Sequence, residues 1–331
     1  MSTPLEGFQP PSPPIAPAPE SAQRPKNMMF VGIALAVIGI LVLIGGIVKF
    51  VPGGIPTGAF LILVGLLCVG LSFITLPVTQ SDEPPMSPIQ KIIGIFFEPS
   101  RVFRNLRVHP RWLAAFVVIG IVTNIYAIAF VQRLTPKRIV DFTVDKIVES
   151  GFVPPDRVDQ AREAQMDQAT NPVQRVQTVV KSFLGIFVLL CLVSGLFFLG
   201  VLAFGGRINY WQALSATMYA GLPATVITKL LSVVLLYVKS PDDIHPILNA
   251  ETLVQDNLGI LVTPANHPAL FVAATSIGLL SFYRIWLTAK GLQLTGQKVS
   301  SSAAWGVTIT LTVLAVILGM IFASLFSGFM S

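Results

Sequence analysis

The main pattern along the chain is a series of long apolar runs separated by shorter polar segments. The runs cover residues 28–48, 55–78, 112–131, 182–205, 213–237, 269–287 and 304–328. They lack the periods of 3.6 or 2 that mark an element with one solvated face. A helix needs about 20 apolar residues to cross a bilayer, where its backbone polar groups must be satisfied internally. The pattern therefore predicts an all-α, polytopic transmembrane helical bundle of about seven spans.

The spacing of these runs divides the chain into three parts. Residues 1–27 are rich in Pro, Ser and Ala, which predicts a disordered Pro-rich tail; its PxxP spacing would also suit an SH3-like groove. Residues 28–78 hold two runs joined by a short turn with Pro52 and two glycines, which predicts a transmembrane hairpin. Residues 89–328 hold the other five runs, which we expect to form one membrane domain.

The segment 132–181 is the only long polar loop between runs. Thr135-Pro136 predicts a helix start, and apolar residues recur with helical spacing up to Gly151. The pair 154–155 is Pro-Pro and should end this helix, after which residues 156–168 predict a second, polar helix. We expect a small helical cap outside the bilayer.

The segment 87–111 is too short and too charged to span a membrane. Ser100 is a plausible N-cap for a short helix. One face of this helix would be apolar and the other polar, with Val102, Phe103 and Leu106 on the first and Arg101, Arg104 and Asn105 on the second. We interpret it as an interfacial helix that presents Arg101, Arg104 and Arg107 to anionic lipid headgroups. The alternative is a charged loop.

Composition agrees with a membrane protein. Hydrophobic residues make up 53% of the chain and charged residues only 11%, against about 25% charged residues in soluble domains. The net charge of +6 could indicate nucleic acid binding. Because the basic residues lie beside apolar runs and are not interleaved with aromatic residues, we expect anionic headgroups as partners and no nucleic acid.

The distribution of Lys and Arg predicts the orientation in the membrane. With the N-terminus in the cytoplasm, the short inner segments carry Arg24, Lys26, Lys91, Arg101, Arg104, Arg107, Arg111, Arg207, Lys290 and Lys298, and the short outer loops only Lys49 and Lys239. The long outer loop carries eight more basic residues and brings the count near balance. We expect a cytoplasmic N-terminus and an outer C-terminus, in the plasma or inner membrane if the protein is bacterial.

Aromatic residues lie near the ends of several runs. They are Trp112, Tyr210, Trp211, Tyr237 and Trp305. This placement is typical of an interfacial belt.

The sequence contains little that would support catalysis. None of the three histidines has metal-ligand spacing, no nucleotide or hydrolase motif occurs, and both cysteines lie within apolar runs. We therefore predict no catalytic, metal or cofactor-binding residue, and no enzyme. Asp242, Asp243 and His245 form a small polar cluster that we interpret as a solvated turn.

Within the apolar runs, three residues are candidates for an intramembrane role. Lys229 carries a charge that is costly in hydrocarbon and often functional, but its side chain could also snorkel to the outer face. Pro223 should kink the same helix six residues earlier. For Asn124 we expect an interhelical hydrogen bond in preference to a role as a substrate ligand.

Three short segments carry a resemblance to a known family. They are residues 95–103, which read IFFEPSRVF; residues 210–214 and 219–223, which read YWQAL and YAGLP; and residues 286–292, which read WLTAKGL. From about residue 89 onward the chain resembles the Yip family of membrane proteins, which implies a five-helix Yip domain with a cytoplasmic entry. The resemblance implies links to membrane trafficking and to Rab-type (Rab/Ypt) GTPases in eukaryotes, and an undefined role in bacteria. The extra hairpin and the long loop depart from the eukaryotic pattern, so no functional residue is carried over.

Two functions remain open at this point. We expect a non-enzymatic integral membrane protein that organises the membrane, partner membrane proteins or copies of itself, through the interfacial helix and helix contacts. The alternative is a small-solute or lipid transporter that uses Lys229 and the Pro223 kink. An aqueous cavity at Lys229 would favour transport.

Overall fold

The computed structural model describes residues 24–77, 84–149, 154–248, 250 and 253–326. The predicted tail falls almost wholly outside these residues. The described elements are α1 (Lys26–Ile47), α2 (Gly54–Ser72), α3 (Pro88–Phe97), α4 (Pro99–Val108), α5 (Leu113–Leu134), α6 (Pro136–Glu149), η1 (Pro155–Arg157), α7 (Val158–Thr170), α8 (Pro172–Ala203), α9 (Tyr210–Val238), η2 (Pro241–Asp243), η3 (Leu258–Leu261), α11 (Pro268–Thr275), α12 (Leu279–Thr295) and α13 (Ser301–Leu325). This part of the chain has no strand, which confirms the all-α helical bundle.

Six of the described helices are long and apolar enough to cross a membrane: α1, α2, α5, α8, α9 and α13. Large apolar side chains stay exposed along them, such as Leu41 at 64%, Leu189 at 60% and Ile317 at 47%. A patch of this extent would be costly in water but is expected where lipid is the solvent. The chain is a multi-pass membrane protein.

The sixth predicted span, over residues 269–287, is wrong as a single helix. α11 ends at Thr275 and α12 begins only at Leu279. Between them, Gly278 pairs with Asn257 of the preceding loop, and the Asp256 side chain accepts the backbone N–H of Leu280 at the start of α12. Both pieces still pack along α13, so together they follow the depth of that helix.

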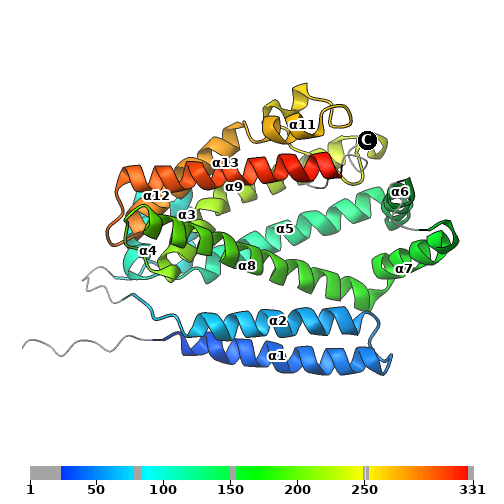
Figure 1. The fold of residues 1–331 in the computed structure, drawn as a ribbon, viewed down its shortest axis with the longest axis horizontal. Coiled ribbons are helices and arrows are strands. Elements are labelled where there is room, and N and C mark those ends of the chain that lie inside the picture. The colour runs from blue at the N-terminus through cyan, green and yellow to red at the C-terminus, as the bar shows by residue number, and fades with distance from the viewer. Residues whose placement is uncertain (1–23, 78–83, 150–153, 249, 251–252, 327–331) are drawn as a thin grey trace, which may run out of the picture.

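Figure 1 shows the long helices running roughly parallel between two ends of the molecule. One end, which we call the basic end, holds α3, α4 and the turns at 204–209 and 296–300. The other, the cap end, holds α6, α7 and the loops around η2 and η3. α1 starts at the basic end and α13 finishes toward the cap end, so the first and last helices begin and end on opposite sides.

Glycine allows the two helices of the hairpin to pack closely. A Cβ atom at Gly32 would lie 2.7 Å from the carbonyl oxygen of Gly65, and one at Gly58 would lie 2.5 Å from that of Gly39. Such small residues let membrane helices approach backbone to backbone. The turn that joins them places Gly53 at φ +66°, a conformation that glycine adopts without strain.

The first half of α9 is the centre of the bundle. An Asn209–Gln212 capping box starts the helix, and nearly every residue of its first three turns is buried. α3, α4, α5, α8 and α12 all contact α9. Because this helix reaches both the membrane core and the basic end, it fixes the elements that form the candidate site.

Candidate functional site

The candidate site is the outer surface of α4 at the basic end. Val102, Phe103 and Leu106 form the apolar face of α4, and their exposed fractions are all 0%. This face packs against α9 and α12. The sequence predicts an interfacial amphipathic helix on anionic headgroups. In the structure its apolar face is part of the protein core, so α4 is held in one fixed position.

Asn105 was expected on the polar face of α4, and that is wrong. Its exposed fraction is 0%, its amide donates to the carbonyl of Pro84, and its oxygen accepts the backbone N–H of Met86. Asn105 thus anchors the chain that leads into α3. Only the three arginines of this helix remain on its outer side.

The start of α4 also differs from expectation. Ser100 is not the N-cap: the helix begins at Pro99, and Glu98 occupies the cap position without a side-chain cap bond. The serine that does cap a helix is Ser87, in a capping box with Gln90 at the start of α3. Pro99 follows directly on α3, and proline at the first position of a helix ends the previous one and starts the next.

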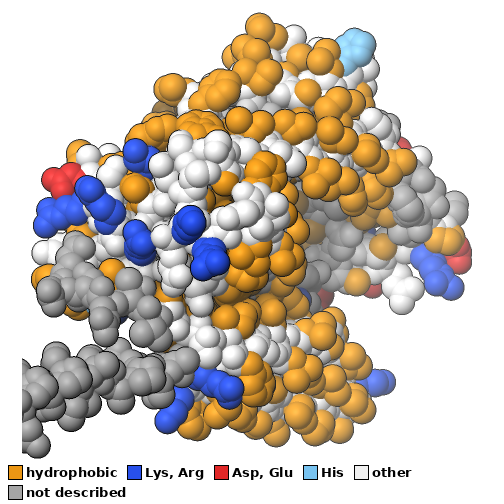
Figure 2. Space-filling model, turned by 60° about the vertical axis from the view of Figure 1, so that its left-hand side comes forward, with side chains coloured by type: hydrophobic (Ala, Val, Ile, Leu, Met, Phe, Trp, Pro, Cys, Tyr) orange, Lys and Arg blue, Asp and Glu red, His pale blue; other side chains and the backbone are white. Residues whose placement is uncertain are grey.

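Arg101, Arg104 and Arg107 are all exposed and three residues apart, so they follow one side of α4; we call them the α4 arginine stripe. Arg101 pairs with Glu98 at 3.2 Å across the surface. Arg107 donates to the carbonyl of Gln297 at 3.0 Å, which ties the stripe to the turn before α13. Figure 2 shows Lys and Arg side chains gathered over this end of the molecule.

Charge is strongly separated between the two ends. Within the described segments 84–112, 204–209 and 288–300, Glu98 is the only carboxylate, beside Lys91, Arg101, Arg104, Arg107, Arg111, Arg207, Lys290 and Lys298. The other described carboxylates belong to α6, η1, α7 and the loops after α9. A surface with one sign of charge attracts anions.

Lys91 on α3 lies beneath this surface. Its exposed fraction is 1%, and its Nζ donates to the carbonyl of His109 at 3.4 Å. Burial, helped by the neighbouring charge of Arg111, lowers the pKa of Lys91 to about 8. Lys91 therefore belongs to the core of the basic end and not to its exposed surface.

Tyr210 and Trp211 are buried, and their prediction as an interfacial belt is wrong. Their exposed fractions are 7% and 1%. The indole N–H of Trp211 donates to the carbonyl of Ile74 at 3.0 Å, and Asn209 donates to that of Thr75 at 3.0 Å. These bonds fasten the end of the hairpin to the start of α9. An Asn-x-x-Gln spacing before an apolar run predicts the helix start. Nothing in the sequence predicts that the carbonyls of Ile74 and Thr75 accept these hydrogen bonds.

The three intramembrane candidates do not form one site. Lys229 of α9 is 7% exposed, and its Nζ lies 4.7 Å from the centre of the Tyr126 ring on α5. Lys229 therefore does not snorkel to the outer face. Its ammonium group makes a cation–π contact with Tyr126 inside the bundle. Asn124 was predicted to bond between helices, and that is wrong: it donates to the carbonyl of Gly120, one turn earlier in its own helix. α9 continues through Pro223, which is buried.

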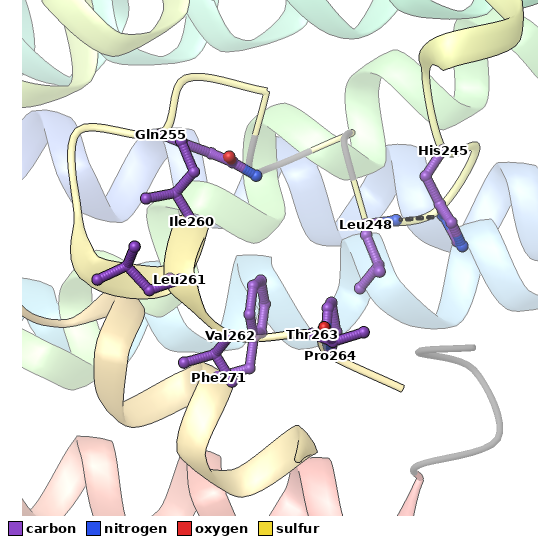
Figure 3. Close-up of a pocket in the computed structure, with 10 residues that line it drawn as sticks. His245, Leu248, Gln255, Ile260, Leu261, Val262, Thr263, Pro264 and Phe271 are labelled. Carbon is purple, nitrogen blue, oxygen red and sulfur yellow. Dashed lines mark hydrogen bonds between the residues drawn. The ribbon is translucent and has the colours of Figure 1, made fainter. Parts of the chain in front are cut away.

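Two cavities lie toward the cap end. The larger, of about 860 Å³, opens between α5 and α8 beneath α6 and α7; we call it the lateral cavity. Asn124 contributes to its wall, but Lys229 lines neither cavity. The smaller, of about 340 Å³, lies among the loops around η3 and α11. Figure 3 shows its lining by Ile260, Leu261 and Phe271.

The residues of the predicted polar cluster, Asp242, Asp243 and His245, do not share one set of partners. The ring nitrogen Nδ1 of His245 accepts the backbone N–H of Leu248, as Figure 3 shows, and its ring packs against Phe142 at 4.8 Å. Asp242 instead pairs with Arg138 of α6 at 3.5 Å. Across the described residues, no group of three or more His, Cys, Asp or Glu side chains is placed to hold a metal ion.

Comparison with known proteins adds one finding. The family model described as the Yip1 domain matches residues 93–323, which is more than half of the chain. The match begins within α3 and ends within α13, so it includes α4 and α9 but not the α1–α2 hairpin. No curated protein and no solved structure shows a significant match.

Proposed function

Since the chain belongs to the Yip family of membrane proteins, we propose that it is a non-enzymatic membrane organiser that gathers anionic lipids at its basic end. The observation that supports this is the α4 arginine stripe on a helix whose opposite face is fully buried. A fixed helix presents its charges without the entropy cost of ordering a mobile segment on each encounter. Partner membrane proteins or further copies of the chain would meet on the lipid patch so formed.

The proposed orientation places the basic end in the cytoplasm. The segments predicted to lie on the inner side come together at this end, and the cytoplasmic leaflet has a negative surface potential. Each Lys or Arg near such a surface contributes about 1 kcal/mol of attraction. The link to trafficking that the family resemblance implies stays a prediction, because it rests on no residue of this chain.

The proposal is tested by the lipid that accompanies the protein. The full chain is reconstituted in nanodiscs with equal amounts of phosphatidylglycerol and phosphatidylcholine, and the lipid retained after purification is quantified by mass spectrometry. Arg101→Gln, Arg104→Gln and Arg107→Gln together should remove most of the phosphatidylglycerol enrichment. The matched control, Lys137→Gln with Arg157→Gln and Lys239→Gln, removes three exposed charges at the cap end and should keep it.

Two results would contradict the proposal. Equal retention of the two lipids by the unmodified protein would show that the basic end gathers no anionic lipid. An equal loss in both triple variants would show that total charge, and not the α4 arginine stripe, sets the enrichment.

A further inference from the structure

The lateral cavity arises because α5 and α8 diverge. Near the middle of the bundle they meet through Phe116 and Phe183, whose ring centres are 4.7 Å apart, and through Phe183 packed over Gly120. Toward the cap end they separate, and α6 and α7 close the top of the gap. Arg162 of α7 holds this closure by pairing with Asp141 and Asp145 of α6, at 3.3 and 2.8 Å.

The wall of the cavity changes character along its length. Its α5 and α8 walls are mainly apolar, with Ile128, Val131, Val176, Val179 and Val180 beside the small polar side chains of Asn124, Thr178 and Ser182. Toward the cap end it is lined by Gln165, Gln168 and Arg175. From Pro172 to Ser182 of α8 the cavity runs about 15 Å at 1.5 Å per residue. The site therefore has a long apolar body and a polar end.

The cavity is open to the surroundings of the protein. Val176, Val179 and Val180 on its α8 wall are 64%, 37% and 39% exposed. Both long walls are helices that qualify as membrane spans. The α8 wall lies beside the hairpin turn, where Gln177 donates to the carbonyl of Pro52, so the opening is at the outer edge of the bilayer. An apolar space of this kind holds water poorly. A lipid at this level can insert one chain sideways between α5 and α8 while its headgroup stays at the membrane surface.

The polar end selects a negative charge. Arg175 lies in the first turn of α8, where the helix dipole also favours an anion, and among the described residues it makes no ion pair. No described carboxylate lines the cavity. The side chain of Asp167, on α7, is bound by Asn171 and Gln174. A guanidinium binds phosphate through paired hydrogen bonds, and the neighbouring glutamine amides add donors.

We propose that the lateral cavity binds one anionic phospholipid, with an acyl chain between α5 and α8 and its phosphate at Arg175. The volume of about 860 Å³ falls within the range of small-ligand sites. This site lies at the cap end, away from the α4 arginine stripe, and does not depend on the proposed function of that stripe.

Native mass spectrometry of the full chain tests the proposal, with phosphatidylglycerol and phosphatidylcholine of identical acyl chains as probes. The unmodified protein should retain one phosphatidylglycerol after delipidation, at least fivefold more than phosphatidylcholine. Val180→Trp fills the cavity and should remove this lipid. Leu189→Trp, an equal change on an exposed part of α8 outside the cavity, should leave it bound. Val176→Phe serves as a milder filling variant if Val180→Trp is not monodisperse.

Charge at the site is tested separately. Arg175→Gln should bring retention of the two lipids to within about twofold, because it leaves the apolar chain site intact but removes the phosphate contact. Arg157→Gln, at an exposed position outside the cavity, should keep the preference. The proposal is overturned if no lipid is retained, if a soluble peptide or solute occupies the cavity instead, or if the filling and control variants behave alike. The Arg101, Arg104 and Arg107 triple variant should still retain one phosphatidylglycerol, which distinguishes this site from the basic end.

Discussion

The ring of Phe103 on α4 lies against Gly291 on α12, so that a Cβ atom at residue 291 would stand 3.0 Å from the ring carbon Cε1. This contact holds the apolar face of α4 inside the bundle and therefore points the α4 arginine stripe outward. It joins two of the segments by which the chain resembles its family, residues 95–103 and 286–292. The Phe103 ring fills the space that the absence of a side chain at Gly291 leaves open.

Gly291→Val should push the Phe103 ring out of place and lower the free energy of unfolding by about 1–3 kcal/mol, as overpacking of a filled core does. The measurement is thermal unfolding of the detergent-solubilised full chain. Gly185→Val on α8 is the control, since a Cβ there meets nothing within 4 Å. A transition temperature for Gly291→Val equal to that of the control would show that α4 is not seated on α12.

The buried Lys91 makes stability depend on pH. The pKa of this lysine falls from 10.5 in the unfolded chain to about 8 in the fold, chiefly because burial disfavours its charge. Below about pH 8 the lysine is protonated in both states, so its unfavourable contribution is constant. Between about pH 8 and 10.5 the unfolded chain binds more protons, and this group's contribution to the free energy of unfolding rises with pH.

Lys91→Met should remove this rise and stabilise the protein near neutral pH, because an apolar side chain then fills the site. Transition temperatures of both proteins, measured from about pH 7 to about pH 10, give the difference that belongs to Lys91 alone. The gap between the variants should shrink as pH increases. A gap that stays constant or widens with pH would mean that Lys91 keeps an ordinary pKa.

Much of the fold followed from the length of the apolar runs and from the positions of proline. The two hairpin helices, the helices of the polar loop and the boundary at Pro136 matched the elements observed. The break between α11 and α12 did not, because Thr275 to Leu279 lies inside an apolar run. The break depends on the pairing of Gly278 with Asn257 in the loop before α11, a contact that hydrophobic periodicity does not reveal.

The candidate site was predicted from a short helix with one apolar and one basic face. The apolar face is buried and all three arginines are exposed. The burial of Asn105 was missed because the sequence pattern does not distinguish a buried polar residue from an exposed one in a short helix. Its partners, Pro84 and Met86, come from the preceding segment and are specified by tertiary structure. The inward direction of Trp211 was missed for the same reason.

The hydrogen bond from Trp211 to Ile74 predicts how the hairpin is attached. Trp211→Phe keeps the ring but leaves the carbonyl without its donor, which should cost about 1 kcal/mol and loosen α2 from the bundle. Limited proteolysis near residue 78 should become faster, and the unfolding temperature should fall. Trp286→Phe is the matched control, because that ring is 39% exposed. Equal proteolysis rates in both variants would contradict this attachment.

The two ends of the bundle should be labelled from opposite sides of the membrane. Gln297→Cys at the basic end and Asp243→Cys at the cap end are both exposed positions, and the native Cys68 and Cys191 are buried. In intact cells, an impermeant maleimide should react with Asp243→Cys, and with Gln297→Cys only after permeabilisation. The reverse pattern would place the basic end outside, and labelling of both from one side would contradict the fold.

The central claim is that the α4 arginine stripe lies at the level of the lipid headgroups, and a spin label placed there measures this most directly. Labels at Arg104→Cys and at Leu189→Cys, the latter on a lipid-exposed turn of α8, are compared in bilayers that carry a nickel-chelating lipid. We predict that headgroup-bound nickel relaxes the label at residue 104 strongly and the label at residue 189 weakly. The account is contradicted if the label at residue 104 responds to a water-soluble nickel complex but not to the nickel held at the headgroups.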